Sequence, residues 1–470
     1  MHIVPIILSG GLGSRLWPSS LGGQPKQFIN LLGSKRSLFQ ETLLRVNEIK
    51  EAEIPIVICN NDHRFFVQHQ SLEIGLLPEI IIEPSVRDTF AAISCASIFA
   101  QQKYGNCKLV IFPSDHRIQD MENFAFSIEN ALTILSRDQT ILLGANPLSP
   151  NPNFGYIQYI KSSNEDIFQV EKFIEKPSEK LAKKLLDSQN IFWNCGIFLF
   201  ESNTILKEIE NIDPISLQHI KNSVQLIEKD LNFLRLDKKS FEKIKKVSID
   251  KHLIENIKNI FVLPLLSDWN DYGSWESIFE NVSKDSDGNV LYGNILSKES
   301  KGCFISSDSS SVLAIGVDNM IIIHANDKIL ICSRSKLSDL KSFFGASDFV
   351  NNTALTDSRK TFRPWGFYES IVLENKYQVK MLTVFRGQKL SLQLHHKRSE
   401  NWVIVDGEAT IQKGNDKLVL AFGESIFIPK KTKHSIENNG DKDLKIIEVQ
   451  CGDYIGEDDI QRFEDLYNRL

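Results

Sequence analysis

The stretch IVPIILSGGLGSRLWPSSLGGQPKQF, residues 3–28, decides how the first part of the chain folds. Its apolar run, residues 3–8, has the length and the β-branched content of a strand buried in a parallel sheet. Glycines follow this strand at Gly10, Gly11 and Gly13. Glycines allow positive φ angles and let phosphate groups approach backbone N–H groups, while Arg15 and Lys26 add positive charge. We therefore predict a phosphate-binding loop after the first strand.

The spacing in this loop differs from the common nucleotide motifs. It is not the GxxxxGK[ST] of a P-loop, and Arg15 stands where a GxGxxG motif needs its third glycine. A glycine-rich segment alone is equally compatible with a plain turn. The longer string GGxGxRLWP, followed by PKQF, resembles the signature of sugar-1-phosphate nucleotidyltransferases, in particular the mannose-1-phosphate guanylyltransferases. The resemblance implies that Arg15 and Lys26 are catalytic groups at a nucleoside triphosphate.

Length and composition indicate a globular protein of several domains. The chain has 470 residues, 42% of them hydrophobic, which is enough for two or three cores. Its net charge of −6 is spread without long runs of one sign, so we expect neither a nucleic-acid surface nor a membrane surface as partner. The seven cysteines form no CxxC pair, and the sequence shows neither a leader segment nor an apolar run of membrane-helix length. We expect a cytoplasmic protein that binds small molecules.

Residues 1–285 alternate between apolar strands and helices. We expect strands at residues 54–60, 79–83, 108–116 and 140–146, and helices at 37–46 and 89–102. A third helix is expected after the strand at 108–116 and should end at about residue 136. This order predicts an α/β fold, a Rossmann-like nucleotidyltransferase domain with a mixed sheet that binds ligands at the carboxyl ends of its strands. The charged segment 178–247 is expected to be helical, since apolar residues recur at helical spacing in EKLAKKLLDS and SVQLIEKDLNFLRL.

The segment EPSVRDTFAAI, residues 83–93, follows one of these strands. It resembles the base-recognition segment of the guanylyltransferases, which usually reads EPxxRNTAPAI; Asp88, Phe90 and Ala91 differ from that pattern. The resemblance implies that Glu83 and Arg87 line the nucleotide pocket. The alternative is a helix start that is capped by Asp88 or Thr89 and has no further role.

Two aspartates are candidates for binding Mg²⁺. Asp115 follows the apolar strand 109–112 in PSDH, where it faces the expected phosphate loop, and the alternative is a turn-forming residue. The segments SIDKHLIEN and DWNDYGSWESIFE also fit the family pattern, in which Asp250 and Asp271 recur. Asp115 and Asp271 could together hold one Mg²⁺ ion against the phosphates of both substrates. We predict that both are catalytic.

Three further segments are expected on the sugar side: NFGYIQYI, VEKFIEKP and NCGIFLF. In the family that the chain resembles, they build the sugar-phosphate side of the cleft. The resemblance implies close approach of the sugar at Gly155, hydroxyl contacts at Glu175 and Asn194, and a phosphate contact at Lys176. For FIEKP, the alternative is an ordinary strand end with a charged pair before a proline.

Residues 286–345 read as short β runs without a helical period, and in the family such a segment resembles a left-handed β-helix. Its surface could serve dimerisation, so we expect a homo-oligomer, a dimer. Residues 346–358 are polar and predict a linker, and residues 359–470 predict a separate β-rich domain.

This last domain carries a candidate site for Zn²⁺ or another divalent metal. Gln393 and His395 are two apart on a strand and point to one face, Glu400 can return to that face from the neighbouring strand, and His434 lies on a later strand. The spacings around Glu400 and His434 resemble the two cupin motifs, although Lys431 replaces one glycine. The alternative is a set of polar residues that satisfy one another inside a β-sandwich.

The strings QLHHKRSENW and IEVQCGDYIGEDDIQRFEDLYNR resemble the C-terminal domain of type II phosphomannose isomerases, which is commonly fused behind the guanylyltransferase. Lys397 and Asn401 replace two usual histidines, and Leu21 stands where arginine is usual. Arg398 is a candidate for substrate contact, and the sequence assigns no isomerase base.

The sequence thus predicts a bifunctional enzyme of GDP-mannose supply. Mannose 1-phosphate would attack GTP to give GDP-mannose and pyrophosphate, and the cupin barrel would interconvert mannose 6-phosphate and fructose 6-phosphate. Two alternatives remain at this point: a guanylyltransferase with a degenerate, sugar-binding cupin, and a non-catalytic regulatory subunit that senses nucleotide sugars.

Overall fold

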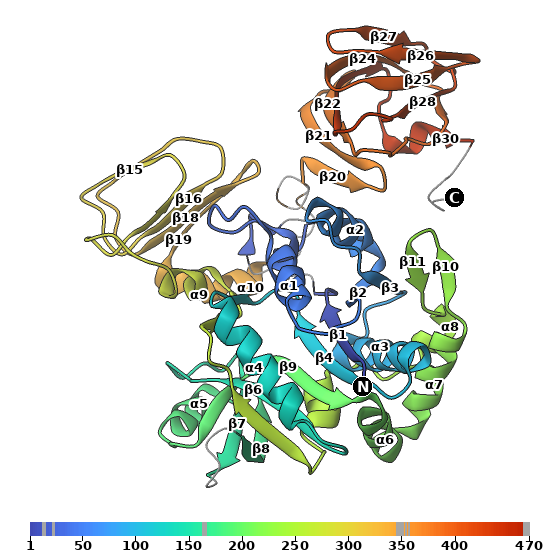
Figure 1. The fold of residues 1–470 in the computed structure, drawn as a ribbon. Coiled ribbons are helices and arrows are strands. Elements are labelled where there is room, and N and C mark those ends of the chain that lie inside the picture. Colours follow the sequence, from blue (N-terminus) through green and yellow to red (C-terminus); the bar gives the residue numbers. More distant parts are fainter. Residues whose placement is uncertain are drawn as a thin grey trace. The chain divides into compact units, whose positions relative to one another are not determined.

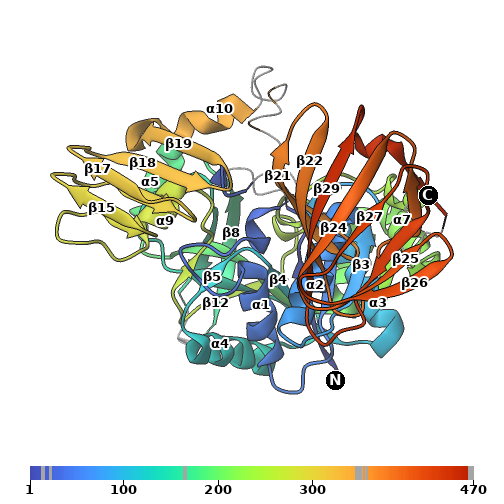
Figure 2. The same cartoon turned by 90° about the horizontal axis from the view of Figure 1, so that it is seen from above.

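The computed structural model describes residues 1–11, 16–20, 24–161, 167–344, 352, 355 and 358–463. The chain forms two compact units, Met1–Val350 and Asn351–Leu470, which are shown by sequence colour in Figures 1 and 2. Three residues of the sequence analysis, Gly13, Arg15 and Leu21, lie outside the described residues, as does most of the predicted linker.

Within the described residues, one large sheet of eleven strands organises the first unit, in the order β10-β11-β3-β2-β1-β4-β9-β6-β12-β8-β7. The strands are β1 Ile3–Leu8, β2 Ile56–Asn60, β3 Glu79–Glu83, β4 Lys108–Pro113, β6 Thr140–Ala145, β7 Gly155–Ile160, β8 Phe168–Glu175, β9 Ile191–Glu201, β10 Glu228–Asp230, β11 Phe233–Arg235 and β12 Ile260–Pro264. The central strands β1 to β4 run parallel, whereas β9 is antiparallel to both β4 and β6. The mixed sheet confirms the predicted α/β fold.

The register of the parallel strands places their carboxyl ends at one edge of the sheet. Leu8 is paired with Ile58 on one side and with Pro113 on the other, and Asn60 is paired with Glu83. The loops after β1, β2, β3 and β4 therefore leave the sheet side by side, which is the usual position of ligand sites in such folds.

Helices connect and cover these strands: α1 Leu38–Asn47, α2 Arg64–Glu73, α3 Asp88–Tyr104, α4 Met121–Ile134, α5 Glu179–Leu186, α6 Ser202–Ile212, α7 Pro214–Gln225, α8 Lys238–Phe241 and α9 Trp275–Glu280. Helix α1 begins with a capping box, in which the Ser37 side chain accepts from the Gln40 N–H and the Gln40 side chain accepts from the Ser37 N–H. Helix α3 is buried along most of its length, and Phe90, Ile93 and Ile98 belong to the same core as β1 and β2. This packing fixes the start of α3 beside the carboxyl ends of the strands.

One predicted helix is wrong. Residues 223–236 end α7 and then form the β10–β11 hairpin at the edge of the sheet, where β11 pairs in parallel with β3 (Figure 1). The turn contains Leu231 with φ +56°, a conformation that no helix accommodates. Arg235 and Asp230 form an ion pair of 2.6 Å across the hairpin. The helical spacing of the apolar residues was overridden because the exposed edge of β3 offers backbone hydrogen bonds.

The β segment after α9 consists of short strands, as predicted, and all but β19, which pairs antiparallel with β18, pair in parallel. It comprises β14 Val290–Tyr292, β15 Ile295–Lys298, β16 Phe304–Ser307, β17 Val312–Ile315, β18 Met320–Ala325 and β19 Lys328–Ser333. Strands β14, β16 and β18 pair in parallel, and so do β15 and β17. Gly293 has φ +99°, and a Cβ atom there would lie 2.1 Å from the Ser307 carbonyl oxygen, so this corner requires glycine. The short helix α10, Leu340–Phe344, follows.

The second unit is a pair of antiparallel sheets, which confirms the predicted cupin barrel. One sheet has the order β20-β21-β22-β29-β24-β27 and the other β26-β25-β28-β23-β30. The strands are β20 Lys360–Arg363, β21 Gly366–Leu373, β22 Tyr377–Val384, β23 Gln393–His395, β24 Arg398–Asp406, β25 Ala409–Lys413, β26 Asp416–Leu420, β27 Ser425–Ile428, β28 His434–Glu437, β29 Leu444–Gly452 and β30 Ile460–Arg462. Trp402, Ile404 and Ile436 are fully buried in its core. Lys431, at the glycine position of the cupin motif, has φ +59°.

Two general features follow from the described residues. None of the helices among them is both long and apolar enough to cross a membrane. The seven cysteines all lie in the described part of the chain, and each is a free thiol.

We predict that residues 351–470 fold without the first unit, because this unit has its own buried core. The isolated segment should unfold cooperatively in urea, as followed by tryptophan fluorescence. Trp402→Ala should lower its stability by about 3 to 5 kcal/mol, since it removes a fully buried aromatic side chain. A gradual, non-cooperative transition in the unsubstituted segment would contradict the prediction.

Candidate functional sites

A pocket of about 360 Å³ lies at the carboxyl edge of the sheet in the first unit. Its lining includes five residues that the sequence predicted to be part of the site: Gly10, Gly11, Glu83, Arg87 and Asp115. The lining also includes Gln27, Asn60 and Lys246, which were not predicted from the sequence. For Gln27 and Asn60 a signal existed, because the first belongs to the PKQF string and the second ends a buried strand.

Side chains behind the glycine loop hold its carbonyl groups. Gln27 Nε2 donates to the Gly11 carbonyl at 2.9 Å, and Asn60 Nδ2 donates to the Gly10 carbonyl at 3.3 Å. His63 Nδ1 lies 3.1 Å from the Ser9 carbonyl. In a trans peptide the N–H points away from the C=O. The N–H groups of Gly10 and Gly11 are therefore directed away from these side chains, as a phosphate cradle requires.

Glu83, at the end of β3, is a buried carboxyl group in the wall of this pocket. The residue is 7% exposed, and a Cβ atom on Gly10 would lie 3.1 Å from its Oε2. Burial, helped by the nearby charge of Asp88, raises the pKa of Glu83 to about 8. A carboxyl group that is largely protonated at neutral pH can both donate and accept a hydrogen bond, so Glu83 is suited to a ligand that offers both.

Lys26 connects the two predicted magnesium ligands. Its Nζ donates to Asp115 Oδ2 at 3.0 Å and to the backbone carbonyl of Asp271, and the residue is only 4% exposed. Burial alone would raise the pKa of Asp115, but the positive charge of Lys26 and the hydrogen bond that Lys26 donates lower it below its usual value. Asp115 therefore stays ionised, with a side chain that is 39% exposed. Lys26 belongs to the acidic pair and is not an exposed surface charge.

A two-stranded ribbon brings these aspartates together. Strands β5, Arg117–Ile118, and β13, Trp269–Asn270, pair antiparallel, so Asp115 and Asp271 lie at the same end of the ribbon. Trp269 Nε1 donates to His116 Nδ1 at 3.1 Å, so His116 takes part in the packing of this ribbon. Burial lowers the pKa of His116, so its ring is neutral at neutral pH.

The four residues predicted for the sugar side lie together at β7, β8 and β9. Gly155 pairs with Glu175, and a Cβ atom on Gly155 would lie 2.7 Å from Glu175 Oε2 and 3.2 Å from the Asn194 Cβ. A larger residue at position 155 would therefore collide with its neighbours. Lys176 Nζ lies 2.5 Å from Glu175 Oε1.

Asp250 joins this cluster. Asn194 Nδ2 donates to Asp250 Oδ1 at 2.9 Å, and Asp250 begins the π-helical turn Asp250–Ile254. Burial, together with the nearby charge of Glu175, raises the pKa of Asp250 to about 7. Turns of this type are rare and recur at functional sites. We call Gly155, Glu175, Lys176, Asn194 and Asp250 the sugar-side cluster.

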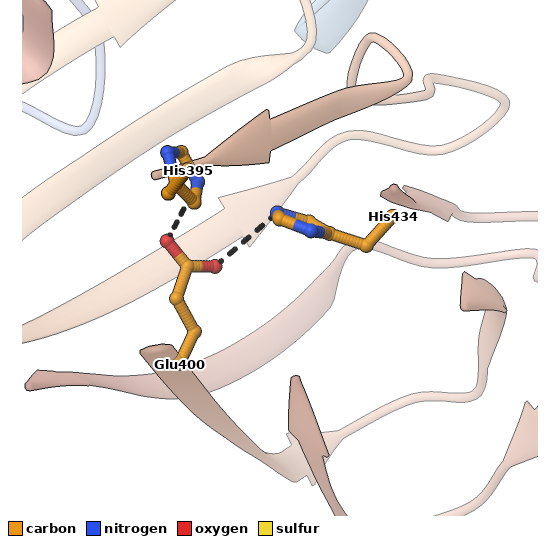
Figure 3. Close-up of side chains that lie close together, drawn as sticks. All are labelled: His395, Glu400 and His434. Atoms are coloured by element: carbon orange, nitrogen blue, oxygen red, sulfur yellow. Dashed lines mark ion pairs between the residues drawn. The ribbon is translucent and has the colours of Figure 1, made fainter. Parts of the chain in front are cut away.

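The second unit contains a cluster of His395, Glu400 and His434 (Figure 3), whose ligand atoms all lie within 4.8 Å of one another. His395 Nε2 is 2.9 Å from Glu400 Oε1, and His434 Nε2 is 3.5 Å from Glu400 Oε2. Glu400 lies on β24, the next strand along the chain, which belongs to the opposite sheet, and its side chain faces both histidines (Figure 3). The fourth predicted ligand, Gln393, pairs directly with His434 and borders the same cavity as Glu400.

The chemistry of this cluster fits a cation. His434 Nδ1 lies 2.8 Å from the Thr432 carbonyl, so this nitrogen carries the proton and Nε2 presents its lone pair to Glu400. Burial lowers the pKa of His434, which keeps the ring neutral. Within the described part of the chain, three buried atoms of the cluster have no hydrogen-bond partner: His395 Nε2, Glu400 Oε2 and His434 Nε2. A divalent metal would satisfy all three acceptors at once.

Further polar residues surround the cluster: Arg398 was a candidate from the sequence, whereas Glu448 and Gln450 were not predicted. Gln450 Nε2 donates to Glu400 Oε1 at 3.1 Å and to Glu448 Oε2 at 2.9 Å, and Trp402 Nε1 donates to Glu448 Oε1 at 3.1 Å. Arg398, 1% exposed, approaches Glu400 with its Nε at 3.4 Å. The alternation in the string IEVQ, which places every second residue on one face, could have revealed Glu448 and Gln450.

The two residues that replace usual histidines, Lys397 and Asn401, lie away from the cluster. Lys397 is exposed, with Nζ 4.5 Å from the ring centre of Tyr454, and Asn401 is exposed on β24. Neither substitution therefore removes a side chain from the group of ligands.

The family comparisons cover nearly the whole chain. Residues 4–288 match the Nucleotidyl transferase family, residues 293–343 the MannoseP isomerase/GMP-like beta-helix domain, and residues 350–465 the Mannose-6-phosphate isomerase C-terminal domain. The solved structure of a mannose-1-phosphate geranyltransferase from Thermus thermophilus is similar with a TM-score of 0.65 and 24% identity, over 74% of this chain and 100% of that one. At this identity the likeness concerns the fold alone.

Curated relatives match over their full length. The chain is 37% identical over 474 residues to a mannose-1-phosphate guanylyltransferase of Salmonella montevideo, covering 99% of this chain and 100% of the relative. It is 36% identical over 468 residues to the xanthan biosynthesis protein XanB of Xanthomonas campestris pv. campestris strain B100, covering 99% of each. The chain therefore belongs to the mannose-1-phosphate guanylyltransferase family of nucleotidyl transferases, with the C-terminal domain of mannose-6-phosphate isomerases.

Proposed function

We propose that the first unit transfers GMP from GTP to mannose 1-phosphate and releases pyrophosphate. A phosphate oxygen of the sugar attacks the α-phosphorus in line, and the bond from this phosphorus to the oxygen that bridges to the β-phosphate breaks. The observation that carries the proposal is the contact of Lys26 with both Asp115 and Asp271. Asp115 also lines the pocket that contains Gly10 and Gly11, whose N–H groups would hold phosphates.

The reaction asks the protein for positioning and charge neutralisation. Asp115 and Asp271 are the residues that would hold Mg²⁺, which supplies positive charge to the phosphates when bound. Lys26, Arg15 and the N–H groups of Gly10 and Gly11 would stabilise the charge that develops on the departing pyrophosphate. Because Asp115 stays ionised, it is ready to accept the cation.

Glu83 and Arg87 would contact the base end of the nucleotide. Guanine offers N–H donors on one edge and the O6 acceptor beside them, and a pocket carboxyl group can bond to that edge. On the sugar side, Glu175, Asn194 and Asp250 would bond to hydroxyl groups, with Lys176 near the phosphate. Glycine at position 155 leaves room for the Glu175 carboxylate at this wall, because a Cβ atom there would lie 2.7 Å from Glu175 Oε2.

The second unit is proposed to interconvert mannose 6-phosphate and fructose 6-phosphate. His395, Glu400, His434 and Gln393 would hold Zn²⁺ or another divalent ion, which polarises the carbonyl and hydroxyl oxygens of the substrate when bound. The unsatisfied acceptor atoms of the cluster support this assignment. Arg398 lies next to Glu400 and would orient the substrate.

We also propose that the protein is cytoplasmic, works as a dimer and supplies polysaccharide biosynthesis, as the name of the xanthan-related relative suggests. The β segment supports dimerisation, because apolar side chains on it are exposed: Leu296 by 70%, Leu313 by 66% and Ile331 by 64%. Exposed apolar patches of this kind are typical of protein interfaces.

Asp115→Asn and Asp271→Asn should each lower turnover of GTP and mannose 1-phosphate by about 100-fold or more, because each weakens the charge that stabilises the transferring phosphoryl group. Pyrophosphate release with Mg²⁺, measured across four nucleoside triphosphates and several sugar 1-phosphates, tests both the residues and the substrate choice. Asp268→Asn, an exposed neighbour, is the matched control. Near-normal rates in both variants would disprove the metal assignment.

His434→Ala should release the metal of the second unit and abolish isomerase activity, while guanylyl transfer remains almost unchanged. Metal content and both activities are measured on one preparation, with the exposed His396→Ala as control. An isomerase that is inactive in the unsubstituted protein would favour the degenerate cupin instead.

Asp250 should make stability depend on pH. Its folded-state pKa of about 7 lies above the unfolded value of about 4, so the folded state keeps the proton that the unfolded state has lost. The free energy of unfolding should therefore fall as pH rises from about 4 to 7. Asp250→Asn should remove this contribution. The free energy of unfolding of the variant, measured in urea, should therefore rise relative to that of wild type across that pH window. The exposed Asp187→Asn should show no such trend.

A further inference from the structure

The nucleotide pocket and the sugar-side cluster meet at the first turn of α3. Arg87, Asp88 and Thr89 line the nucleotide pocket, and Thr89 is the second residue of the helix. The segment 247–254, which carries Asp250 of the sugar-side cluster, packs against this same turn. Arg87 Nη1 also donates to the Ile244 carbonyl, at 3.3 Å, just before that segment.

Three direct contacts join the helix start to the segment. The Ile249 N–H donates to Thr89 Oγ1 at 2.9 Å, and the Phe90 N–H donates to the Val247 carbonyl at 3.3 Å. The rings of Phe90 and His252 meet edge to face, with centroids 4.6 Å apart and an interplanar angle of 77°. Phe90 is fully buried, so this contact cannot relax toward solvent.

The segment is also held from its other side. His252 Nε2 lies 3.0 Å from Asp213 Oδ2, and Asp213 caps helix α7 by accepting from the Ser216 N–H at 2.9 Å. His252 is thus fixed between Phe90 and Asp213, two residues after Asp250 in the same π-helical turn. A shift of the first turn of α3 would therefore disturb the contacts that hold this π-helical turn, which carries the carboxyl group that contacts Asn194.

We propose that Thr89 and Phe90 are positioning residues that couple nucleotide binding to sugar-phosphate binding. A nucleotide in the pocket restricts the first turn of α3, and the three contacts pass this restriction to Asp250. Mannose 1-phosphate then binds to a cluster that is already ordered, so it binds more tightly. By reciprocity the sugar phosphate strengthens nucleotide binding equally. This inference rests on the proposed guanylyl transfer and adds the residues that link its two substrates.

The test is a binding cycle measured by calorimetry on the full chain with Mg²⁺. Mannose 1-phosphate is titrated alone and in the presence of saturating α,β-methylene GTP, whose carbon bridge prevents pyrophosphate release. In wild type the analogue should raise the sugar-phosphate affinity by about tenfold. In Thr89→Val, which lacks the hydroxyl acceptor for Ile249, the increase should fall below about threefold. Thr89→Ser keeps the hydroxyl and should restore the wild-type factor.

Two further variants separate coupling from simple loss of structure. Phe90→Leu should reduce the coupling in the same direction, and Thr133→Val, which removes a helix hydroxyl on α4, should leave it unchanged. Melting curves confirm that each variant is folded. Wild-type coupling in both folded Thr89→Val and folded Phe90→Leu would overturn the inference while leaving guanylyl transfer intact. Failure of either ligand to bind the unsubstituted protein would instead overturn the proposed function, and the inference with it.

Discussion

The burial of one ammonium group, that of Lys26, governs the site of the first unit. A buried charge is costly unless it is paired, and Lys26 finds its partners in Asp115 at 3.0 Å and in the carbonyl of Asp271. These residues are far apart in the chain, so the contact ties the N-terminal loop to the ends of two other segments. The next residue, Gln27, holds the carbonyl of Gly11, so the same short turn also shapes the phosphate loop.

In the second unit, buried hydrogen-bond acceptors, and not a buried positive charge, lack a sufficient set of partners. Between its two sheets, the Glu400 carboxylate faces Nε2 of His395 and Nε2 of His434. Its Oε1 accepts from Gln450 Nε2 at 3.1 Å and from Arg398 Nε at 3.4 Å, whereas its Oε2 has no hydrogen-bond partner among the described residues. Buried acceptors that face acceptors are unfavourable unless a positive ion lies between them. The neighbouring Glu448 is satisfied by contrast, since it accepts from both Trp402 and Gln450. The unpaired acceptors of His395, Glu400 and His434 converge on one point, where a metal would complete the polar network.

The sugar-side cluster illustrates how close packing and charge act together. Glycine at position 155 leaves room for the Glu175 carboxylate, and this negative charge adds to burial in raising the pKa of Asp250. Asp250 in turn lies on a π-helical turn that rests on the start of α3. The residues that would contact the two substrates are consequently parts of one packed body, which is the physical basis for coupling between them.

The sequence by itself determined the features that depend on local pattern. The apolar run of residues 3–8 was sufficient to predict β1, because the pattern of a buried strand is encoded within a few residues. Gly10 and Gly11, which follow this strand, do not adopt the positive φ angles that the sequence suggested for the loop. The alternation of Gln393 and His395 likewise placed both on one face. Helix α3 and the strands before and after it followed from periodicity.

Only the tertiary structure decided which elements are in contact and how the surroundings of each ionisable group shift its pKa. Residues 223–236 have a helical pattern, yet the free edge of β3 draws them into a hairpin, since backbone pairing across the sheet outweighs local propensity. Glu400 reaches the histidines from the opposite sheet, and Lys26 is buried by segments that no local pattern connects to it. The partnership of Asp250 with Asn194 depends on a distance that exists only after folding. Burial and long-range contacts set these pKa values and pairings. Neither burial nor a long-range contact can be predicted from the residues that are adjacent in the sequence.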